Sequence, residues 1–248
     1  PAIRGNLPFH LVTSSLERTG KGKLINLCLG VVVTGSSIPP MQPGTDEAER
    51  EKRLASLLLA GETVVHLDNL PVEEVLNSAA LASLATSRTF RTRVLGASNT
   101  PVLDNDLTVV LSGNNTRAAG ELAKRTIPII LQPKTDHPED RTDFRHPHVE
   151  AYGRACRRDV LAALLGMVEA WKSAGQPAPP TGVPMGGFEE WVSTIGGILW
   201  HAGHRAWMTN YRDWIRSSDQ FAADAEALLL RWREIYPDGR LISPREVL

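Results

Sequence analysis

The feature that most constrains this chain is a short loop between an apolar strand and an apolar helix near its N-terminus. Phe9–Thr13 has the length and character of a buried strand, and Leu24–Leu29 is typical of a helix. The connecting loop ends in Thr19-Gly20-Lys21. A strand, a tight loop ending in Gly-Lys and a helix form the arrangement of a phosphate-binding loop. Its backbone N–H groups and its lysine present positive charge to a polyphosphate.

Three positions depart from the usual pattern of such a loop. The pattern has glycine six residues before the lysine, where this chain has Ser15, and Ser or Thr directly after it, where this chain has Gly22. Arg18 adds bulk where the backbone has to approach a phosphate. The loop alone therefore leaves open whether a nucleotide binds.

Length and composition set the general class of the protein. The chain has 248 residues, 42% of them hydrophobic and 22% charged, as in an ordinary globular protein with room for a larger and a smaller domain. A net charge of −1 gives no overall attraction to nucleic acid or to an anionic membrane, so such binding would need a local patch. No apolar run reaches the roughly 20 residues of a membrane span. The two cysteines are expected to be reduced, buried thiols of a cytoplasmic protein.

A second apolar strand is predicted at Thr63–Asn69, and an aspartate, Asp68, lies at its carboxyl end. Carboxyl ends of parallel strands collect ligands, and Asp68 at such an end can hold Mg²⁺. The alternative is that Asp68 caps a helix predicted from Pro71 to Leu84. His66, within the same strand, is interpreted as a core residue.

Two β-rich runs, Thr89–Val94 and Asp106–Leu111, predict a strand–turn–strand unit. Its first arm carries alternating arginines, which are either solvated charges on an edge strand or a face that contacts phosphates. They are Arg88, Arg91 and Arg93. The strand Leu107–Leu111 leads to Asn114, which can orient a water molecule or stand in a plain turn. Pro128 places the strand Thr126–Leu131 at a sheet edge.

The second half of the chain predicts helices. Arg154–Lys172 is amphipathic, and residues 175–187, rich in proline and glycine, form the clearest linker. We expect residues 1–174 to form the main domain with a lid helix. Residues 188–248 are expected to form a small helical domain, with a winged-helix arrangement as one form. Its tryptophans are interpreted as core, with base stacking as the alternative.

In this order, the segments resemble the ATPase portion of phage and mobile-element primase–helicase proteins, of the AAA+ or superfamily 3 type. The likeness rests on the Thr-Gly-Lys-Gly loop, Val-Val-His-Leu-Asp-Asn, the arginine-bearing strand, Leu-Ser-Gly-Asn-Asn, and Glu-Leu-Ala-Lys-Arg-Thr-Ile-Pro-Ile. It implies a P-loop NTPase fold of AAA+ type, a parallel sheet flanked by helices and followed by a helical C-terminal domain. It also implies a preceding primase-like region, which fits the abrupt start of the chain.

The resemblance also implies roles for individual residues. Lys21 would bind the β- and γ-phosphates of ATP, within a loop formed by Thr19, Gly20, Gly22 and Lys23. Asp68 would hold Mg²⁺, and Asn114 would position the attacking water.

Two further roles lie between subunits. Arg125, or less directly Lys124, would be the arginine finger that reaches the γ-phosphate bound by a neighbouring subunit. The hairpin with Arg88, Arg91 and Arg93 would face a central channel and follow single-stranded DNA.

Together these expectations describe an ATP-dependent DNA translocase or helicase module that works as a ring, with a hexamer as the expected assembly. The alternative is a P-loop scaffold that has lost turnover but oligomerises and binds DNA or recruits a primase, as Arg18, Gly22 and Asn69 would allow. Asn69 stands where many such ATPases have a glutamate that activates water. A third possibility is a regulatory ATPase outside nucleic-acid work.

Overall fold

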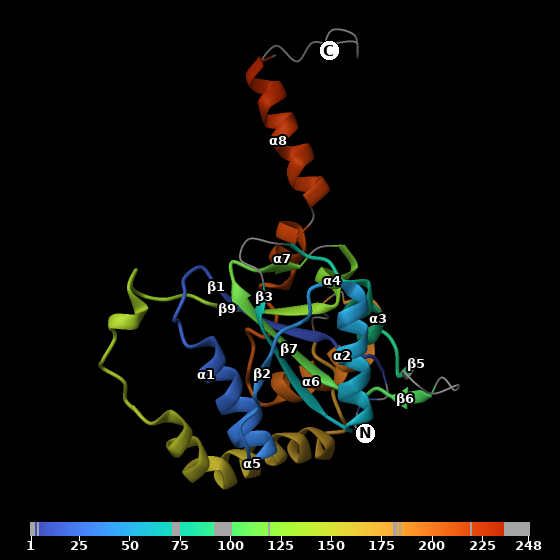
Figure 1. The fold of residues 1–248 in the computed structure, drawn as a ribbon. Helices are drawn as coiled ribbons and strands as arrows, with labels where there is room; N and C mark the ends of the chain where they lie inside the picture. Colours follow the sequence, from blue (N-terminus) through green and yellow to red (C-terminus); the bar gives the residue numbers. More distant parts are fainter. Residues whose placement is uncertain are drawn as a thin grey trace.

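The computed structural model describes residues 3, 5–70, 75–91, 101–118, 120–180, 183, 185–218 and 220–235. Its centre is a five-stranded sheet in which every neighbouring pair of strands is parallel (Figure 1). The order is β2-β3-β7-β1-β9. The strands are β1 (Phe9–Ser14), β2 (Pro40–Met41), β3 (Val64–Leu70), β7 (Thr108–Asn114) and β9 (Thr126–Leu131). Their apolar runs are expected of a sheet with both faces covered, because neither face meets water.

Helices cover the two faces according to the direction in which the chain crosses the sheet. The crossover from β1 runs to the far edge at β2 and carries α1 (Lys21–Ile25) and the π-helix η1 (Asn26–Thr34). The later crossovers run the opposite way and carry α2 (Glu47–Leu59), α3 (Ala79–Ala85) and α4 (Gly120–Lys124). Because crossovers between parallel strands are right-handed, the two sets lie on opposite faces, as Figure 1 shows. Helix α5 (Val149–Ser173) packs on η1.

The first α2 turn shows how local sequence sets a helix boundary. Asp46 is the N-cap, and its side chain accepts a hydrogen bond of 2.8 Å from the backbone N–H of Glu49. The same helix buries Leu54 and Leu58 against the sheet core. A capping aspartate and an apolar face at helical spacing are sequence features typical of such a helix.

Two predictions for the chain between β3 and β7 were wrong: the start of the helix and the pairing of the arginine-bearing strand. The helix expected from Pro71 begins only at Ala79, because Ser78 caps α3 and accepts from the N–H of Leu81; β4 (Val75–Leu76) precedes it and pairs with β8 (Arg117–Ala118). Residues 71–74 lie outside the described part of the chain.

The antiparallel partner of β5 (Thr89–Arg91) is β6 (Val102–Asp104), whereas the expected partner run belongs to β7. Asn105 lies between β6 and β7 and separates them, because its side-chain amide donates to the backbone carbonyls of Leu84 and Ser87 at 2.7 Å each.

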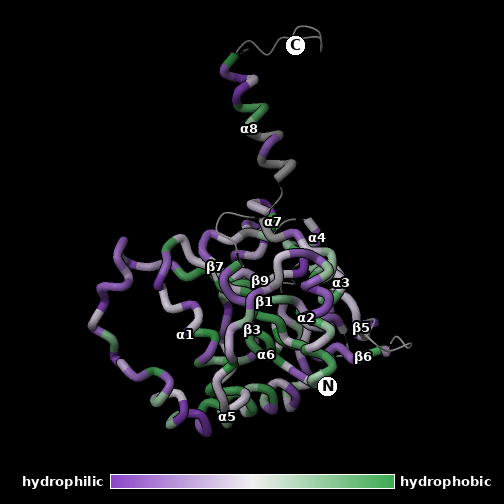
Figure 2. Tube along the Cα trace, viewed as in Figure 1, coloured by the Kyte–Doolittle hydropathy of each residue, from purple (hydrophilic) through white to green (hydrophobic). Residues whose placement is uncertain are grey.

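The C-terminal helices share the core of the sheet. Phe188, Trp191, Tyr211 and Trp214 belong to the same buried cluster as residues of the strands. Figure 2 shows hydrophobic segments, in green, gathered within the body that contains the sheet and α6. The elements concerned are α6 (Glu189–His201) and α7 (Tyr211–Ser218). A division of the chain at residues 175–187 stays a prediction, but the core residues of α6 and α7 pack with the sheet rather than apart from it. The buried tryptophans agree with their interpretation as core.

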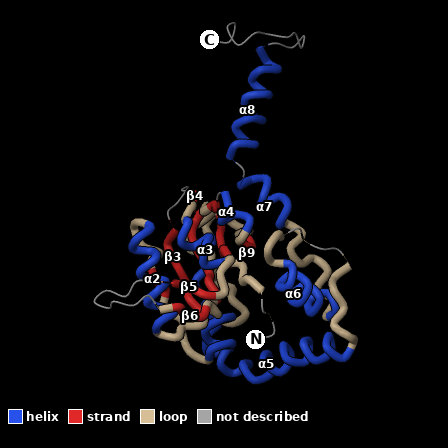
Figure 3. The backbone as a smooth tube through the Cα atoms, turned by 90° about the vertical axis from the view of Figure 1, so that its right-hand side faces the viewer, coloured by secondary structure: helices blue, strands red, loops and turns tan. Residues whose placement is uncertain are grey.

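Helix α8 (Gln220–Ile235) projects away from this body (Figures 1 and 3), and residues 236–248 lie outside the described part. The structure therefore confirms the predicted fold class: a parallel α/β sheet flanked by helices and followed by a helical C-terminal part. A short 3-10 turn, η2 (Pro138–Asp140), lies on the segment that joins β9 to α5. Of the helices described, none is both long and apolar enough to span a bilayer.

Candidate functional site

The candidate site lies where β1 ends between β7 and β9. The crossover that leaves β1 covers one face of the sheet, whereas the crossover that leaves β7 covers the other. Such a reversal opens a crevice outside the carboxyl ends of the strands, and ligands of open α/β sheets bind there. The loop from Ser15 to Gly20 enters this crevice and ends at Lys21, the first residue of α1.

Gly20 gives the loop its turn into the helix. It is the N-cap of α1 with φ 88°, in the left-handed region that glycine adopts without a steric penalty. No side chain caps this helix end. The first N–H groups of a helix have no intrahelical acceptor, so they face the crevice as donors with partial positive charge. Arg18 also has a positive φ, 53°, which side-chain-bearing residues rarely adopt.

Lys21 spans the mouth of the loop. Its ammonium group donates to the carbonyl of Leu16 at 3.4 Å, to Thr19 Oγ1 at 3.3 Å and to Asn114 Oδ1 at the end of β7. Burial lowers the pKa of Lys21, and the negative charges of Asp68 and Glu17 oppose that shift. The predicted lysine, asparagine and aspartate therefore come together in one place.

The two amides at the end of β7, Asn114 and Asn115, make different contacts. Asn114 meets Lys21, whereas Asn115 ties the strand to the loop: its N–H donates to the Ser14 carbonyl at 2.9 Å, and its side chain to the Ser15 carbonyl at 3.3 Å. Gly113 permits the close approach of β3, because a Cβ there would collide with Thr116 Oγ1 and crowd Leu70. The ends of β1, β3 and β7 are thus held side by side.

Asp68 lies at a break in the ladder between β3 and β7. The register shifts between Leu67 and Leu70, and Asn69 has φ 58°. The carboxylate accepts a hydrogen bond from Ser112 Oγ, and its side chain is 42% exposed. The alternative in which Asp68 caps a helix is wrong, since the N-cap of α3 is Ser78.

Sequence reasoning missed the partner of Asp68. Ser112 is fully buried in β7, and its Oγ lies 2.7 Å from Nε2 of His66, which is also buried. Burial lowers the pKa of His66, and the charge of Asp68 opposes that shift. Alternation could have revealed the group, because positions 66 and 68 of one strand share a sheet face.

Gly22 and Lys23, the remaining residues of the predicted loop, lie in the first turn of α1. No atom lies within 4 Å of the position that a Cβ of Gly22 would take, so a hydroxyl-bearing residue would fit there. Lys23 is exposed and lines a cavity of about 1020 Å³ beside the loop.

The cavity lies on the β9 side of the loop. One wall contains Arg18, Thr19, Gly20 and Lys23, and the other is the segment that runs from β9 toward α5. On this segment the guanidinium of Arg141 lies 4.9 Å from the ring centre of Phe144, whose side chain is 50% exposed. Ligand pockets in proteins commonly measure about 300–1,000 Å³, so the cavity has room for a nucleoside.

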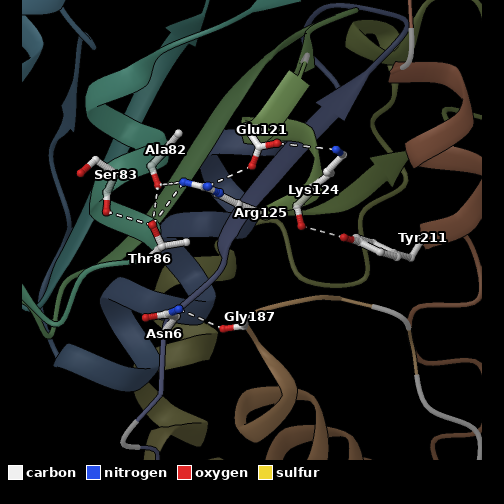
Figure 4. A network of polar contacts seen from close by, with 9 residues as sticks. All are labelled: Asn6, Ala82, Ser83, Thr86, Glu121, Lys124, Arg125, Gly187 and Tyr211. Carbon is white, nitrogen blue, oxygen red and sulfur yellow. Dashed lines mark hydrogen bonds and ion pairs between the residues drawn. The ribbon is translucent and has the colours of Figure 1, made fainter. Parts of the chain in front are cut away.

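Arg125 and Lys124 lie at the other end of the sheet (Figure 4). Thr126, which follows them, pairs with Phe9 at the start of β1, whereas the loop follows the end of β1. Five residue steps of a parallel strand separate the two ends by about 17 Å. Neither residue can therefore reach the loop of its own chain.

Contacts within the chain hold Arg125. Its guanidinium donates to the carbonyl of Ala82, to Thr86 Oγ1 at 3.2 Å and to Glu121 at 2.9 Å (Figure 4). Lys124 is 63% exposed, with its ammonium 3.6 Å from Glu121. Its backbone carbonyl accepts from the hydroxyl of Tyr211 at 2.7 Å, which joins α7 to this corner.

The arginine-bearing hairpin also lies away from the loop, before the start of β7. Arg88 donates to the carbonyl of Gly5 at 3.2 Å and pairs with Asp106 at 3.5 Å. Arg91 is exposed at the end of β5, and Arg93 lies outside the described residues.

No protein-family model and no curated protein matches this chain. Among solved structures it is similar to the C-terminal region of NrS-1, with a TM-score of 0.41 and 14% identity over 60% of this chain and 34% of that one. A second structure of the same region has a TM-score of 0.37 and 12% identity, over 61% of this chain and 34% of that one. The JCV helicase has a TM-score of 0.34 and 12% identity, over 68% of this chain and 56% of that one. The chain thus spans about a third of the length of the NrS-1 chains.

Proposed function

We propose that this chain is the ATPase module of a DNA translocase or helicase, which hydrolyses ATP with Mg²⁺ at the subunit interfaces of a ring. The observation that carries the proposal is the meeting of Lys21 and Asn114, beside Asp68, in the crevice where β1 and β7 end. A lysine at the N-terminus of α1, an amide at the end of β7 and a carboxylate near the end of β3 come together there.

This arrangement suits a triphosphate. Phosphoryl transfer needs positioning and charge neutralisation more than covalent chemistry from the protein. The N–H groups of the loop and Lys21 can donate to phosphate oxygens, and the Asn114 carboxamide can hydrogen-bond the attacking water. The cavity beside Lys23 and Phe144 leaves room for the base and ribose on the β9 side.

Asp68 fits a role as a Mg²⁺ ligand. Mg²⁺ keeps several waters and is typically held by one or two carboxylates together with substrate phosphates. In the parts of the chain that the structure describes, no three His, Cys, Asp or Glu side chains form a metal site, so a cage made by protein alone is not found there. Ser112 donates to Asp68, which keeps the carboxylate an acceptor, as a cation ligand must be. Bound with ATP, the ion would neutralise phosphate charge.

The finger role of Arg125 requires a second subunit. Because Arg125 lies at the far end of β9, it can serve only a neighbour's nucleotide, and it has to leave Ala82, Thr86 and Glu121 to do so. Lys124, more exposed, is the second candidate. A ring, with a hexamer as the proposed form, would present this end of each subunit to the next loop.

DNA contact is assigned to the hairpin. Arg91 is exposed, Arg93 follows it, and Arg88 stands at the base of the hairpin with its charge partly used by Asp106. In the proposed ring these residues face the channel and bind the phosphates of single-stranded DNA. Replacing Arg91 and Arg93 by Ala would remove salt-sensitive DNA binding, whereas a regulatory ATPase outside nucleic-acid work would show none to remove.

A scaffold without turnover is the second candidate. It is favoured by the bulk and left-handed backbone of Arg18, by Gly22 in place of a hydroxyl and by Asn69 in place of an acid. Such a protein would oligomerise and bind DNA, or recruit a primase, without hydrolysing ATP.

Turnover with and without single-stranded DNA separates the two. We expect DNA-stimulated hydrolysis by the wild type and its loss in Lys21→Ala and in Arg125→Ala. Mixing these two variants should restore part of the activity, because a mixed interface combines an intact loop with an intact arginine. An oligomer that binds nucleotide without turnover, and equally well as Lys21→Ala, would favour the scaffold. A purified oligomer that neither binds nor hydrolyses ATP, with DNA present, would refute the proposal.

A further inference from the structure

Three polar side chains on the neighbouring strands β3 and β7 form a hydrogen-bonded series that ends at the candidate site. Nε2 of His66 lies 2.7 Å from Ser112 Oγ, and that hydroxyl donates to Oδ1 of Asp68. The direct separation of His66 Nε2 and Asp68 Oδ1 is 3.8 Å, so the histidine acts on the carboxylate through the serine.

The direction of these bonds follows from the number of protons. A serine hydroxyl has one proton, and here it is donated to Asp68. Toward His66 the oxygen can then only accept, which requires that Nε2 of the imidazole carries a proton. His66 thus acts as a donor that fixes the rotation of the hydroxyl.

Burial shows that this series is more than a surface contact. Ser112 is 0% and His66 3% exposed, within strands whose other buried residues are mostly apolar. Polar groups inside such a core are costly unless they are hydrogen-bonded. At the other end, the Asp68 side chain is 42% exposed, and its charge acts on Lys21 of the candidate site.

Asp68 needs such support because its backbone leaves the regular ladder. The pairing of β3 with β7 shifts between Leu67 and Leu70, and Asn69 adopts φ 58°. Among the described residues, Ser112 provides the hydrogen bond that orients the carboxylate. Oδ1 is engaged by Ser112, and the Asp68 side chain as a whole is still 42% exposed.

We propose that Ser112 and His66 are positioning residues that hold Asp68 in the orientation in which it binds Mg²⁺. This inference rests on the proposed function, because it concerns the same cation. Hydrogen-bonding partners behind a metal ligand typically change metal affinity by about 10–100-fold when they are removed. A change of that size is expected here.

The test is a Mg²⁺ titration of the binding of a fluorescent ATP analogue to the full chain, with thermal unfolding measured in parallel. Ser112→Ala and His66→Phe should raise the Mg²⁺ concentration at half-maximal binding at least about 10-fold. His66→Gln keeps an N–H donor and should stay near the wild type. Binding of the analogue in EDTA should change little in all three.

A matched control is Thr126→Val, which removes another buried hydroxyl, one that donates to the Leu122 carbonyl at 2.7 Å at the far end of the sheet. It should lower stability without moving the Mg²⁺ requirement. An equal shift in Thr126→Val, or a shift in His66→Gln as large as in His66→Phe, would overturn the inference. If Ser112→Ala does not fold, the two His66 variants carry the test.

Failure of the inference and failure of the proposed function give different results. If Mg²⁺ promotes binding of the analogue to the wild type and Asp68→Asn no longer responds to Mg²⁺ at the same concentrations, while Ser112→Ala and His66→Phe behave as the wild type, only the positioning role is refuted. If the wild type shows no Mg²⁺-dependent binding of the analogue, the proposed function fails, and the positioning role fails with it.

Discussion

Replacing Lys21 by Met is the most direct test of the candidate site. Methionine matches the unbranched alkyl part of the lysine side chain but lacks the terminal ammonium group, which contacts Leu16, Thr19 and Asn114. Burial lowers the pKa of Lys21, which shows that the charge is partly withdrawn from water even with the negative charge of Asp68 nearby. A phosphate oxygen that meets this group is therefore only partly screened by solvent.

The magnitude follows from that contact. A hydrogen bond to a charged group contributes about 1.5–3 kcal/mol, and one such bond to phosphate is lost in Lys21→Met. At 1.4 kcal/mol per decade, ATP affinity should fall about 10- to 150-fold. The folded chain should lose less, about 1 kcal/mol, because the three acceptor oxygens lie near the opening and regain water.

Isothermal titration with ATP and Mg²⁺ measures the effect. Lys52→Met is the matched control, since Lys52 is an exposed lysine on α2 and its loss changes the net charge equally. The control should bind as the wild type does. If Lys21→Met binds ATP within about threefold of the wild type while remaining folded, Lys21 does not hold the phosphates and the proposed site is wrong.

Three further predictions concern other parts of the molecule. Gly22→Thr should fold, because no atom lies within 4 Å of its Cβ position, and its hydroxyl should lower the Mg²⁺ concentration needed for half-maximal ATP binding. Gly22→Ala adds no hydroxyl, so it should gain about 0.5–1 kcal/mol in stability and leave that concentration unchanged. Equal effects of the two substitutions on the Mg²⁺ concentration would contradict a role for the hydroxyl. Arg125→Ala should lower the free energy of unfolding by about 1–3 kcal/mol in urea denaturation, since it removes the contacts with Ala82, Thr86 and Glu121; unchanged stability would mean that these contacts do not form in solution. Burial lowers the pKa of His10 from 6.5 to about 4. Between these two pH values the imidazole is protonated in the unfolded chain but neutral in the folded chain, which favours unfolding as the pH falls. The free energy of unfolding should therefore fall by about 3 kcal/mol between pH 6.5 and 4, at 1.36 kcal/mol per pH unit, and His10→Phe should flatten this part of the curve; an equal fall in the variant would assign it to other groups.

The local elements could be read from the sequence where composition and spacing act over a few residues. The strand before the loop and the edge position of β9, which Pro128 indicated, were predicted in this way, and the Asp46 cap of α2 is a feature of the same local kind. Each depends on apolar periodicity, a capping side chain or a missing N–H. That Lys21 and Asn114 lie in contact follows from the meeting of parallel strand ends at one edge of a sheet.

The rest depends on contacts between distant segments. The partner of β5 is set by Asn105, which holds Leu84 and Ser87 and so ends β6 before β7 begins. The contact between Ser112 and Asp68 joins residues 44 positions apart, through a shift in strand register that no local pattern marks. The packing of Trp214 with the sheet likewise arises only in the folded chain.

Both margins of the sheet discourage growth by strand addition. At one margin β2 has two residues, which offers almost no ladder to a foreign strand. At the other, Pro128 lacks the N–H that a new partner would need, and α7 packs next to this strand. Association of copies of this chain by extending the five-stranded sheet is therefore disfavoured, and contacts made elsewhere on the surface would leave each subunit free to tilt against the next without breaking a continuous sheet.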